Sequence, residues 1–286
     1  MISAIISPKS PLKPILNPAS EKLLDAIVKR LPQSLLLTGE NGVGLGTISK
    51  YIANLRNLKP IIILPEFDEK INIEKGIISV DIMRRLHDET RTKTALDRII
   101  IIDYAERMTL HAQNAFLKLL EEPGSGIYFI LVSHSVPKLL PTILSRTEKL
   151  DIKLISTKQS EELLDSLGIT DETKRSQLLF IADGMPAELT RLCVNDEYFQ
   201  RRTNTVRDAR ELLRGNLYQK FVIVQHYKDD RQLVLTLLLD VANILKHSIT
   251  SNPQIDTISR IDAILNAYQR IEANGNIRLC LARMII

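Results

Sequence analysis

The sequence predicts an α/β fold with a parallel sheet in its first half, followed by helices alone. Short apolar runs alternate with helical patterns up to about residue 152, which is typical of a doubly wound α/β domain. The first of these runs leads directly into a glycine-rich loop. Beyond Ser156 the apolar residues recur at helical spacing, and no segment has the pattern of a strand.

Four short apolar runs are predicted to form the strands of the sheet. The third is rich in β-branched residues and ends in Asp103. A continuous apolar run of this kind is typical of a parallel strand that is covered on both faces. The four predicted strands are residues 35–37, 61–64, 98–103 and 127–132.

Capping residues and one-sided apolar patterns predict the helices between these strands. Asn17 followed by Pro18 begins the first helix, because proline fits the first helical turn. Ser79 and Thr109 each precede a further amphipathic segment. The segment after Thr109 ends before Pro123, which cannot continue a helix.

The rest of the chain is predicted to be helical in two groups. Residues 161–167 and 174–181 form a small helical unit, and a turn follows at 183–186. Longer amphipathic helices are expected from about Thr205 onward.

Composition is that of an ordinary globular protein, with 44% hydrophobic and 25% charged residues and a net charge of +4. No apolar run approaches the roughly 18 residues that cross a membrane. The apolar run near the N-terminus has no basic leader, so no signal peptide is expected. Cys193 and Cys280 exclude a zinc site built on C-x-x-C pairs. We therefore expect a cytoplasmic protein with no membrane contact and no bound metal.

Residues 39–46 have the glycine spacing of a phosphate-binding loop without the side chains that make it work. The working motif is G-x-x-x-x-G-K-S/T, in which Lys reaches the outer phosphates and the hydroxyl holds magnesium. Gly39 and Gly44 match, but Leu45 replaces the Lys and Gly46 replaces the Ser or Thr. Leucine cannot neutralise phosphate charge and glycine cannot bind a metal. The loop is also compatible with a simple tight turn between strand and helix.

The strand ending in Asp103 supplies the other half of this degenerate site. An Asp at this position holds magnesium in phosphate-loop ATPases, and the next residue in one branch is a Glu that activates water. Here the next residue is Tyr104, whose phenol is a poor base at neutral pH. Glu106 is an alternative base, and Asp103 is alternatively a cap of its own loop. The candidate nucleotide-binding residues are Gly39, Gly42, Gly44, Gly46 and Asp103, and the site is predicted to be inactive.

Two motifs resemble the bacterial clamp-loader subunits of the AAA+ class. Residues 100–123 contain N-A-F-L-K-L-L-E-E-P, and residues 139–146 contain L-L-P-T-I-L-S-R. The second motif is similar to the stretch before the Ser-Arg-Cys motif of this family, with Thr147 in place of the Cys. The gamma/tau motor type carries the loop Lys, an Asp-Glu pair and a four-Cys zinc site, which are missing here. The chain instead resembles the delta-prime type of DNA polymerase III.

The resemblance implies three domains. These are an AAA+ phosphate-loop domain over residues 1–152, a small helical lid over 153–203 and an all-α collar that oligomerises over 204–286.

The resemblance also implies a role for Arg146 and its neighbour Ser145. Arg146 would act as an arginine finger in trans on ATP that is bound by a neighbouring gamma/tau subunit. The implied assembly is a pentameric ring with gamma/tau and delta subunits, which loads the sliding clamp onto primer-template DNA. No cofactor of its own is expected for this chain.

Several assignments stay open in the sequence. The position called sensor one corresponds to Ser133 or His134, and residues 184–188 lack the Arg that is expected there. An ATP-hydrolysing gamma/tau-type subunit is one alternative, with Glu106 as base and Lys50 in place of the loop Lys. An AAA+-derived adaptor outside replication is the other.

DNA contacts are predicted from charge alone. The candidates for phosphate contacts are Arg84, Arg85 and Arg91.

Overall fold

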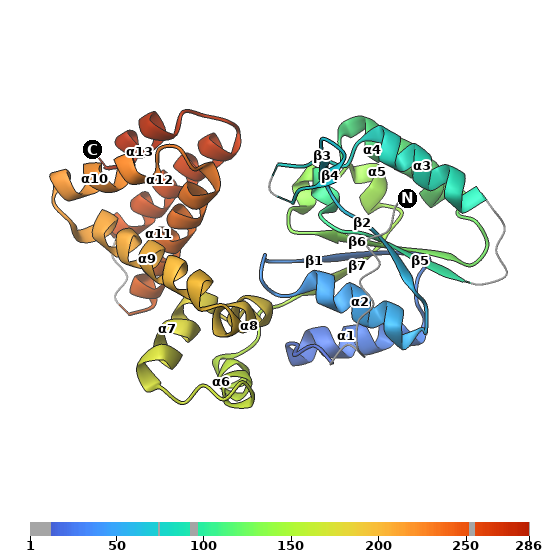
Figure 1. Cartoon of the computed structure of the whole chain (residues 1–286), viewed down its shortest axis with the longest axis horizontal. Helices are drawn as coiled ribbons and strands as arrows, with labels where there is room; N and C mark the ends of the chain where they lie inside the picture. Colours follow the sequence, from blue (N-terminus) through green and yellow to red (C-terminus); the bar gives the residue numbers. More distant parts are fainter. Residues whose placement is uncertain (1–12, 74, 92–96, 252–254, 286) are drawn as a thin grey trace. The chain divides into compact units, whose positions relative to one another are not determined.

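A computed structural model describes residues 13–73, 75–91, 97–251 and 255–285 (Figure 1). The chain divides into two compact units. The first comprises Met1–Arg175 with Ala182–Thr190, and the second comprises Ser176–Ile181 with Arg191–Ile286. The N-terminal run on which the signal-peptide prediction was based lies outside the described residues. No helix within the described ranges is long and apolar enough to cross a membrane.

The first unit is built on a five-stranded parallel sheet in the order β2-β5-β6-β1-β7. All four predicted strands are confirmed, with shifts of one or two residues at their ends. The strands are β1 (Ser34–Gly39), β2 (Pro60–Ile63), β5 (Arg98–Ile102), β6 (Ile127–Ser133) and β7 (Glu148–Ile152).

The edge strand β7 was not among the predicted strands. Leu150 and Ile152 are buried, whereas Glu148, Lys149 and Asp151 are exposed. An edge strand with one solvated face gives a short alternating pattern, which is a weaker signal than the continuous apolar runs of the central strands.

Helices cover both faces of the sheet (Figure 1). Alternate residues of β1 enter different cores: Leu35 and Leu37 pack with α1 and α2, and Leu36 packs with α3, α4 and α5. The predicted caps are confirmed, since the Asn17 side chain accepts from the N–H of Ala19 and the Thr109 hydroxyl from that of Ala112. The helices are α1 (Pro18–Lys29), α2 (Leu45–Leu55), α3 (Val80–Arg91), α4 (Leu110–Glu121) and α5 (Pro141–Leu144).

Shorter elements complete the first unit. A hairpin of β3 and β4 follows the edge strand β2, and two single 3-10 turns follow β5 and β6. Helix α6 and the first part of α8 also belong to this unit. These elements are β3 (Glu66–Phe67), β4 (Lys70–Ile71), η1 (Ala105–Arg107), η2 (Val136–Lys138), α6 (Thr157–Ser166) and α8 (Pro186–Val194).

The second unit is helical, and every regular element described beyond Ser156 is a helix, as predicted. Helix α7 (Glu172–Ala182) contributes residues to both units. Helix α9 starts at Asp196, ahead of the predicted start near Thr205, because Asn195 caps a polar first half that carries little apolar pattern. The others are α10 (Leu217–Tyr227), α11 (Arg231–Ser251), α12 (Ile255–Glu272) and α13 (Ile277–Ile285).

A buried ion pair joins α9 to α11 inside the second unit. The two Nη atoms of Arg202 donate to the two carboxylate oxygens of Asp240 at 2.8 and 2.9 Å. The side chains are 13% and 9% exposed. The pair is therefore bidentate and largely removed from water.

The division into three domains at 152/153 and 203/204 stays a prediction.

Candidate nucleotide site and arginine site

The glycine loop leaves the carboxyl end of β1, between β6 and β7. Gly42 and Gly44 have φ angles of 104° and 92°, which favour glycine because it has no Cβ. Gly44 is the N-cap of α2, without a side-chain cap. The backbone therefore keeps the strand-loop-helix arrangement of a phosphate-binding loop.

The two replaced side chains leave the loop without charge and without a hydroxyl ligand. Leu45 is 1% exposed and packs with Val43 and Ile48 in an apolar core. At Gly46 an added Cβ would lie 3.2 Å from the Oδ2 atom of Asp103. Asp103 therefore lies directly against the point from which the side chain of a magnesium-binding Ser or Thr would extend.

Asp103 lies in a partly buried position next to the loop. Its Oδ1 atom accepts from the backbone N–H of Tyr104 at 3.1 Å. Burial raises the pKa of the Asp103 carboxyl, and the Tyr104 hydrogen bond and the charges of His134 and Lys50 partly oppose this. The Tyr104 ring lies against His134, with 5.5 Å between the ring centroids. No base follows Asp103 directly.

Glu106 is hydrogen-bonded to the backbone just beyond the end of β6. Its Oε1 atom accepts from the backbone N–H of His134 at 3.3 Å, and its buried Oε2 atom has no hydrogen-bond partner among the described residues. The His134 Nδ1 atom is 3.2 Å from the carbonyl oxygen of Gly39, so Nδ1 carries the proton and donates. The Ser133 hydroxyl accepts from the N–H of Ser135. Ser133 thus ends β6 beside the loop, and His134 follows it directly.

Helix α8 begins directly on the glycine loop. Its first residue, Pro186, has no N–H, and the next two, Ala187 and Glu188, donate to the carbonyl of Gly42 at 2.9 and 3.1 Å. An added Cβ at Gly42 would lie 3.0 Å from the Glu188 Cβ, and one at Gly44 would lie 3.3 Å from the Ala187 Cβ. The loop therefore satisfies helix N–H groups that otherwise lack a partner.

Sequence reasoning missed this contact of α8 with the loop. It joins residues that are far apart in the chain, and the local signal was limited to a helix-starting proline followed by a small residue.

A pocket beside the loop has the wrong charge for a polyphosphate. It lies at the carboxyl ends of β1, β6 and β7, where Glu40 and Asp151 line it together with His134. No Lys or Arg is among its lining residues. A site for nucleotide phosphates needs fixed positive charge or a bound cation.

Arg146 lies at the amino ends of the strands, whereas the loop lies at their carboxyl ends. It precedes β7, in which Glu148 pairs with Leu35 at the start of β1, whereas Ile152 pairs with Gly39 at its end. The strand between these two levels spans roughly 13 Å at about 3.3 Å per residue. Ser145 lies beside Arg146, so the predicted site residues form two separate groups.

A carboxylate and neighbouring oxygens hold the Arg146 guanidinium. Its Nη2 atom donates to Glu121 Oε1 at 2.8 Å, and its Nη1 atom donates to the Thr142 carbonyl at 3.1 Å and to Ser145 Oγ at 3.3 Å. The side chain is 38% exposed. Glu121 ends α4 within the N-A-F-L-K-L-L-E-E-P motif, which accounts for an acid at that position. The guanidinium is thus oriented and still accessible.

Replacing Asp103 by asparagine is expected to stabilise the protein at pH 7 by roughly 1 kcal/mol. Asparagine keeps an oxygen that accepts from the Tyr104 N–H, but it removes the partly buried charge. Because folding raises the pKa of Asp103, its contribution to stability is favourable below its unfolded pKa and is lost as the pH rises through the folded pKa. The gain should therefore shrink as the pH falls towards about 4. Urea denaturation between pH 4 and pH 8 measures it.

The matched control is Asp81→Asn, because the Asp81 side chain is 74% exposed. It should change stability by less than about 0.5 kcal/mol at every pH. A destabilised Asp103→Asn variant at pH 7 would contradict the burial argument.

Comparison with known proteins adds sequence relatives. A family described as "DNA polymerase III, delta subunit" matches residues 57–156, a range that contains Asp103 and Arg146 but not the glycine loop. The DNA polymerase III subunit delta' of Bacillus subtilis is 25% identical over 228 residues, which are 69% of this chain and 68% of the relative. The subunit delta' of Pseudomonas aeruginosa is 35% identical over 97 residues, 33% of this chain and 29% of the relative. The chain thus spans about two thirds of one relative and less than a third of the other.

A solved structure shares the fold. It is a DNA polymerase III gamma subunit-related protein of Thermotoga maritima, with a TM-score of 0.53 and 18% identity. The likeness covers 93% of this chain and 97% of the other. It confirms the predicted fold class, a parallel α/β domain followed by helices.

Proposed function

Because this chain belongs to the DNA polymerase III delta' subunit family of clamp-loader proteins, we propose that it acts without hydrolysing ATP, on nucleotide held by a neighbouring subunit. The observation that carries the proposal is the placement of the loop and Arg146 at opposite ends of the strands of one sheet. An arginine in that position cannot serve the loop of its own chain, and a nucleotide that it contacts belongs to another subunit.

The chain's own nucleotide site is idle in this proposal. Leu45 packs in the apolar core, and Asp103 lies against Gly46, which has no hydroxyl that could bind a metal. Two N–H groups at the start of helix α8 already donate to the carbonyl of Gly42. Each feature removes one requirement of Mg-ATP binding: a cation for the phosphates, a metal ligand and open space at the loop. We therefore expect no cofactor in this chain.

Arg146 is the catalytic residue of the neighbouring site in this proposal. A guanidinium presents a planar fork that suits phosphate oxygens and stabilises the charge of phosphoryl transfer. The contacts to Glu121 and Thr142 limit the rotamers of the long side chain, so that less entropy is lost when it meets phosphate. Ser145 supports this orientation through its hydroxyl.

The proposed partners are gamma/tau and delta subunits in a pentameric ring. Helix α10 supports an interface in the collar region, residues 204–286, because four of its apolar side chains are exposed on neighbouring turns. They are Leu217 at 56%, Tyr218 at 78%, Phe221 at 41% and Val222 at 51%. Exposed apolar patches of this kind mark protein contacts.

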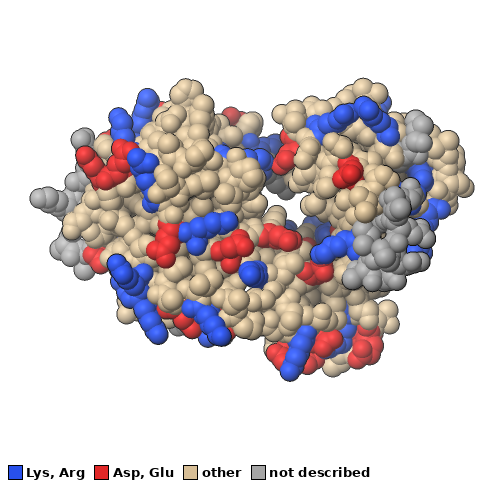
Figure 2. Space-filling view, turned by 180° about the vertical axis from the view of Figure 1, so that it is seen from behind, with Lys and Arg blue, Asp and Glu red and all other residues tan. Residues whose placement is uncertain are grey.

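Contacts to the sliding clamp and to primer-template DNA are proposed to run through the complex. Basic and acidic side chains are interspersed on the face drawn in Figure 2. Arg84 and Arg85 pair with Asp81 and Glu66, respectively. The side chain of Arg91 lies outside the described part. A mixed surface of this kind supports weak phosphate contacts without base readout.

Reconstitution tests the proposed function. The isolated chain is expected to show no hydrolysis and no micromolar Mg-ATP binding by calorimetry. Adding it to gamma/tau and delta subunits, clamp and primed DNA is expected to complete the ring and to raise hydrolysis well above that of the same mixture without it. Hydrolysis by the chain alone, or a mixture that is equally active without it, would overturn the proposal.

A further inference from the structure

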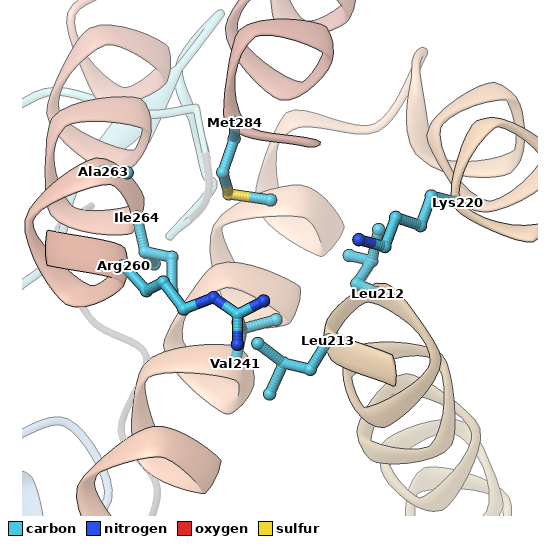
Figure 3. Close-up of a pocket in the computed structure, with 8 residues that line it drawn as sticks. All are labelled: Leu212, Leu213, Lys220, Val241, Arg260, Ala263, Ile264 and Met284. Atoms are coloured by element: carbon cyan, nitrogen blue, oxygen red, sulfur yellow. The ribbon is translucent and has the colours of Figure 1, made fainter. Parts of the chain in front are cut away.

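The arginine site lies on the open surface of the first unit. The side chains of Arg146 and Glu121 are 38% and 51% exposed. Neither belongs to the lining of the small cavity of the second unit (Figure 3) or of the pocket beside the glycine loop. A phosphate that meets Arg146 therefore arrives from solvent or from another subunit, and it arrives beside the carboxylate of Glu121.

Glu121 contacts one of the two terminal nitrogens of the guanidinium. Its Oε1 atom accepts from Nη2 of Arg146 at 2.8 Å, while the Thr142 carbonyl and Ser145 Oγ accept from Nη1 at 3.1 and 3.3 Å. A guanidinium carries five N–H donors. Within the described part of the chain these contacts use at most three of them. At least two donors thus remain for phosphate oxygens while Glu121 stays in place.

The Glu121 carboxylate has the same sign of charge as the phosphate. Because Oε1 lies 2.8 Å from Nη2, a phosphate oxygen on the remaining donors lies only a few ångströms from this carboxylate. In surroundings between protein surface and water, like charges at such a distance weaken binding by about three- to tenfold. Glu121 therefore has two opposite effects: its hydrogen bond orients Arg146, and its charge repels the ligand that Arg146 meets.

We propose that Glu121 is a positioning residue that also restrains Arg146 through its charge. This inference rests on the proposed function, in which Arg146 acts on nucleotide held by a neighbouring subunit. The terminal phosphate of ATP is negative before the reaction as well as during it, so the repulsion acts in both states. An interaction that is equal in both states changes KM and leaves kcat almost unchanged. The neighbouring site therefore requires more ATP than it would beside Arg146 alone.

Replacing Glu121 by glutamine separates orientation from charge. The amide oxygen still accepts from Nη2, but the charge is removed. In the reconstituted complex with clamp and primed DNA, the apparent KM for ATP should fall about three- to tenfold, and kcat should change less than about twofold. Glu121→Ala removes the hydrogen bond as well, so the less ordered arginine should lower kcat about threefold.

Glu122→Gln is the matched control. Glu122 is the next residue, is exposed and carries the same charge, but it takes no part in the three hydrogen bonds of Arg146. Its substitution should leave both KM and kcat unchanged.

A double-mutant cycle tests whether Glu121 acts through Arg146. Binding of a fluorescent, non-hydrolysable ATP analogue to the assembled complex is measured for Glu121→Gln in the parent and in the Arg146→Ala background. The substitution should tighten binding about three- to tenfold in the parent. It should have little effect without Arg146, because an exposed carboxylate that nothing holds beside the nucleotide is screened by water and salt.

The outcomes separate this inference from the proposed function. Equal hydrolysis with Arg146→Ala and the parent overturns both. If Arg146→Ala lowers hydrolysis but Glu121→Gln leaves KM and analogue binding unchanged, only the inference about Glu121 is overturned. The same holds if Glu121→Gln tightens binding equally with and without Arg146.

Discussion

Replacing Arg146 by alanine is expected to lower the clamp- and DNA-stimulated ATP hydrolysis of the motor subunits by roughly a thousandfold, with the ring still assembled. Arginine fingers contribute about 10³- to 10⁵-fold to hydrolysis because they stabilise the charge of the transferring phosphoryl group. Arg146→Lys should recover little of this rate, because an ammonium keeps the charge but lacks the planar fork. Steady-state hydrolysis with reconstituted subunits measures the effect, and size-exclusion chromatography measures assembly.

Loss of folding cannot account for such a drop. The Arg146–Glu121 pair is exposed, with side-chain exposures of 38% and 51%. Exposed pairs contribute roughly 0–1 kcal/mol, so the variant chain should unfold within a few degrees of the parent. Arg207→Ala is the matched control, because Arg207 also pairs with a nearby acid, Asp208, and its side chain is 68% exposed. Equal hydrolysis with Arg146→Ala and the parent, in an intact ring, would leave Arg146 a structural residue.

Replacing Arg202 by methionine is expected to lower the free energy of unfolding by about 3–5 kcal/mol. The substitution leaves the Asp240 carboxylate, 9% exposed, in a largely buried position without the guanidinium that neutralises it. Removing one partner of a buried pair costs far more than the pair contributes, because the remaining charge is no longer solvated by water or by its partner. Urea denaturation followed by circular dichroism at helical wavelengths measures the loss.

A second substitution separates the buried charge from simple packing. The double variant Arg202→Met with Asp240→Leu removes both charges and should recover most of the lost stability. Arg207→Met serves as control, since its pair with Asp208 is 68% exposed on the arginine side and should matter by less than about 0.5 kcal/mol. A double variant that is as unstable as Arg202→Met alone would mean that packing, not charge, dominates this site.

Local sequence patterns predict most of the sheet and of the glycine loop, for identifiable reasons. The central strands are covered on both faces, and this produces continuous apolar runs such as Ile99–Ile102. Helix starts are visible because one side chain, such as that of Asn17 or Thr109, both ends the preceding segment and caps the helix. The loss of the loop's charge and of its hydroxyl can be predicted from the sequence, because Leu45 and Gly46 occupy fixed positions in the motif.

The contacts that organise the sites join distant segments, and local patterns carry no information about them. Arg146 is held by Glu121, His134 by Gly39 and Arg202 by Asp240. None of these pairs has helical or strand spacing in the sequence, so only the folded chain brings them together. The edge strand β7 escapes prediction for a related reason, because half of its side chains face solvent.

The contact between α8 and the carbonyl of Gly42 has a consequence for anions that reach the loop. The N–H groups of Ala187 and Glu188 would otherwise be available to a phosphate, as helix N-termini commonly are. Here their acceptor is tethered to them by the chain itself, and a tethered group acts at an effective concentration of about millimolar or higher. A free anion must out-compete that internal acceptor before it gains any contact. The loop should therefore remain insensitive to swings in cellular phosphate and nucleotide levels.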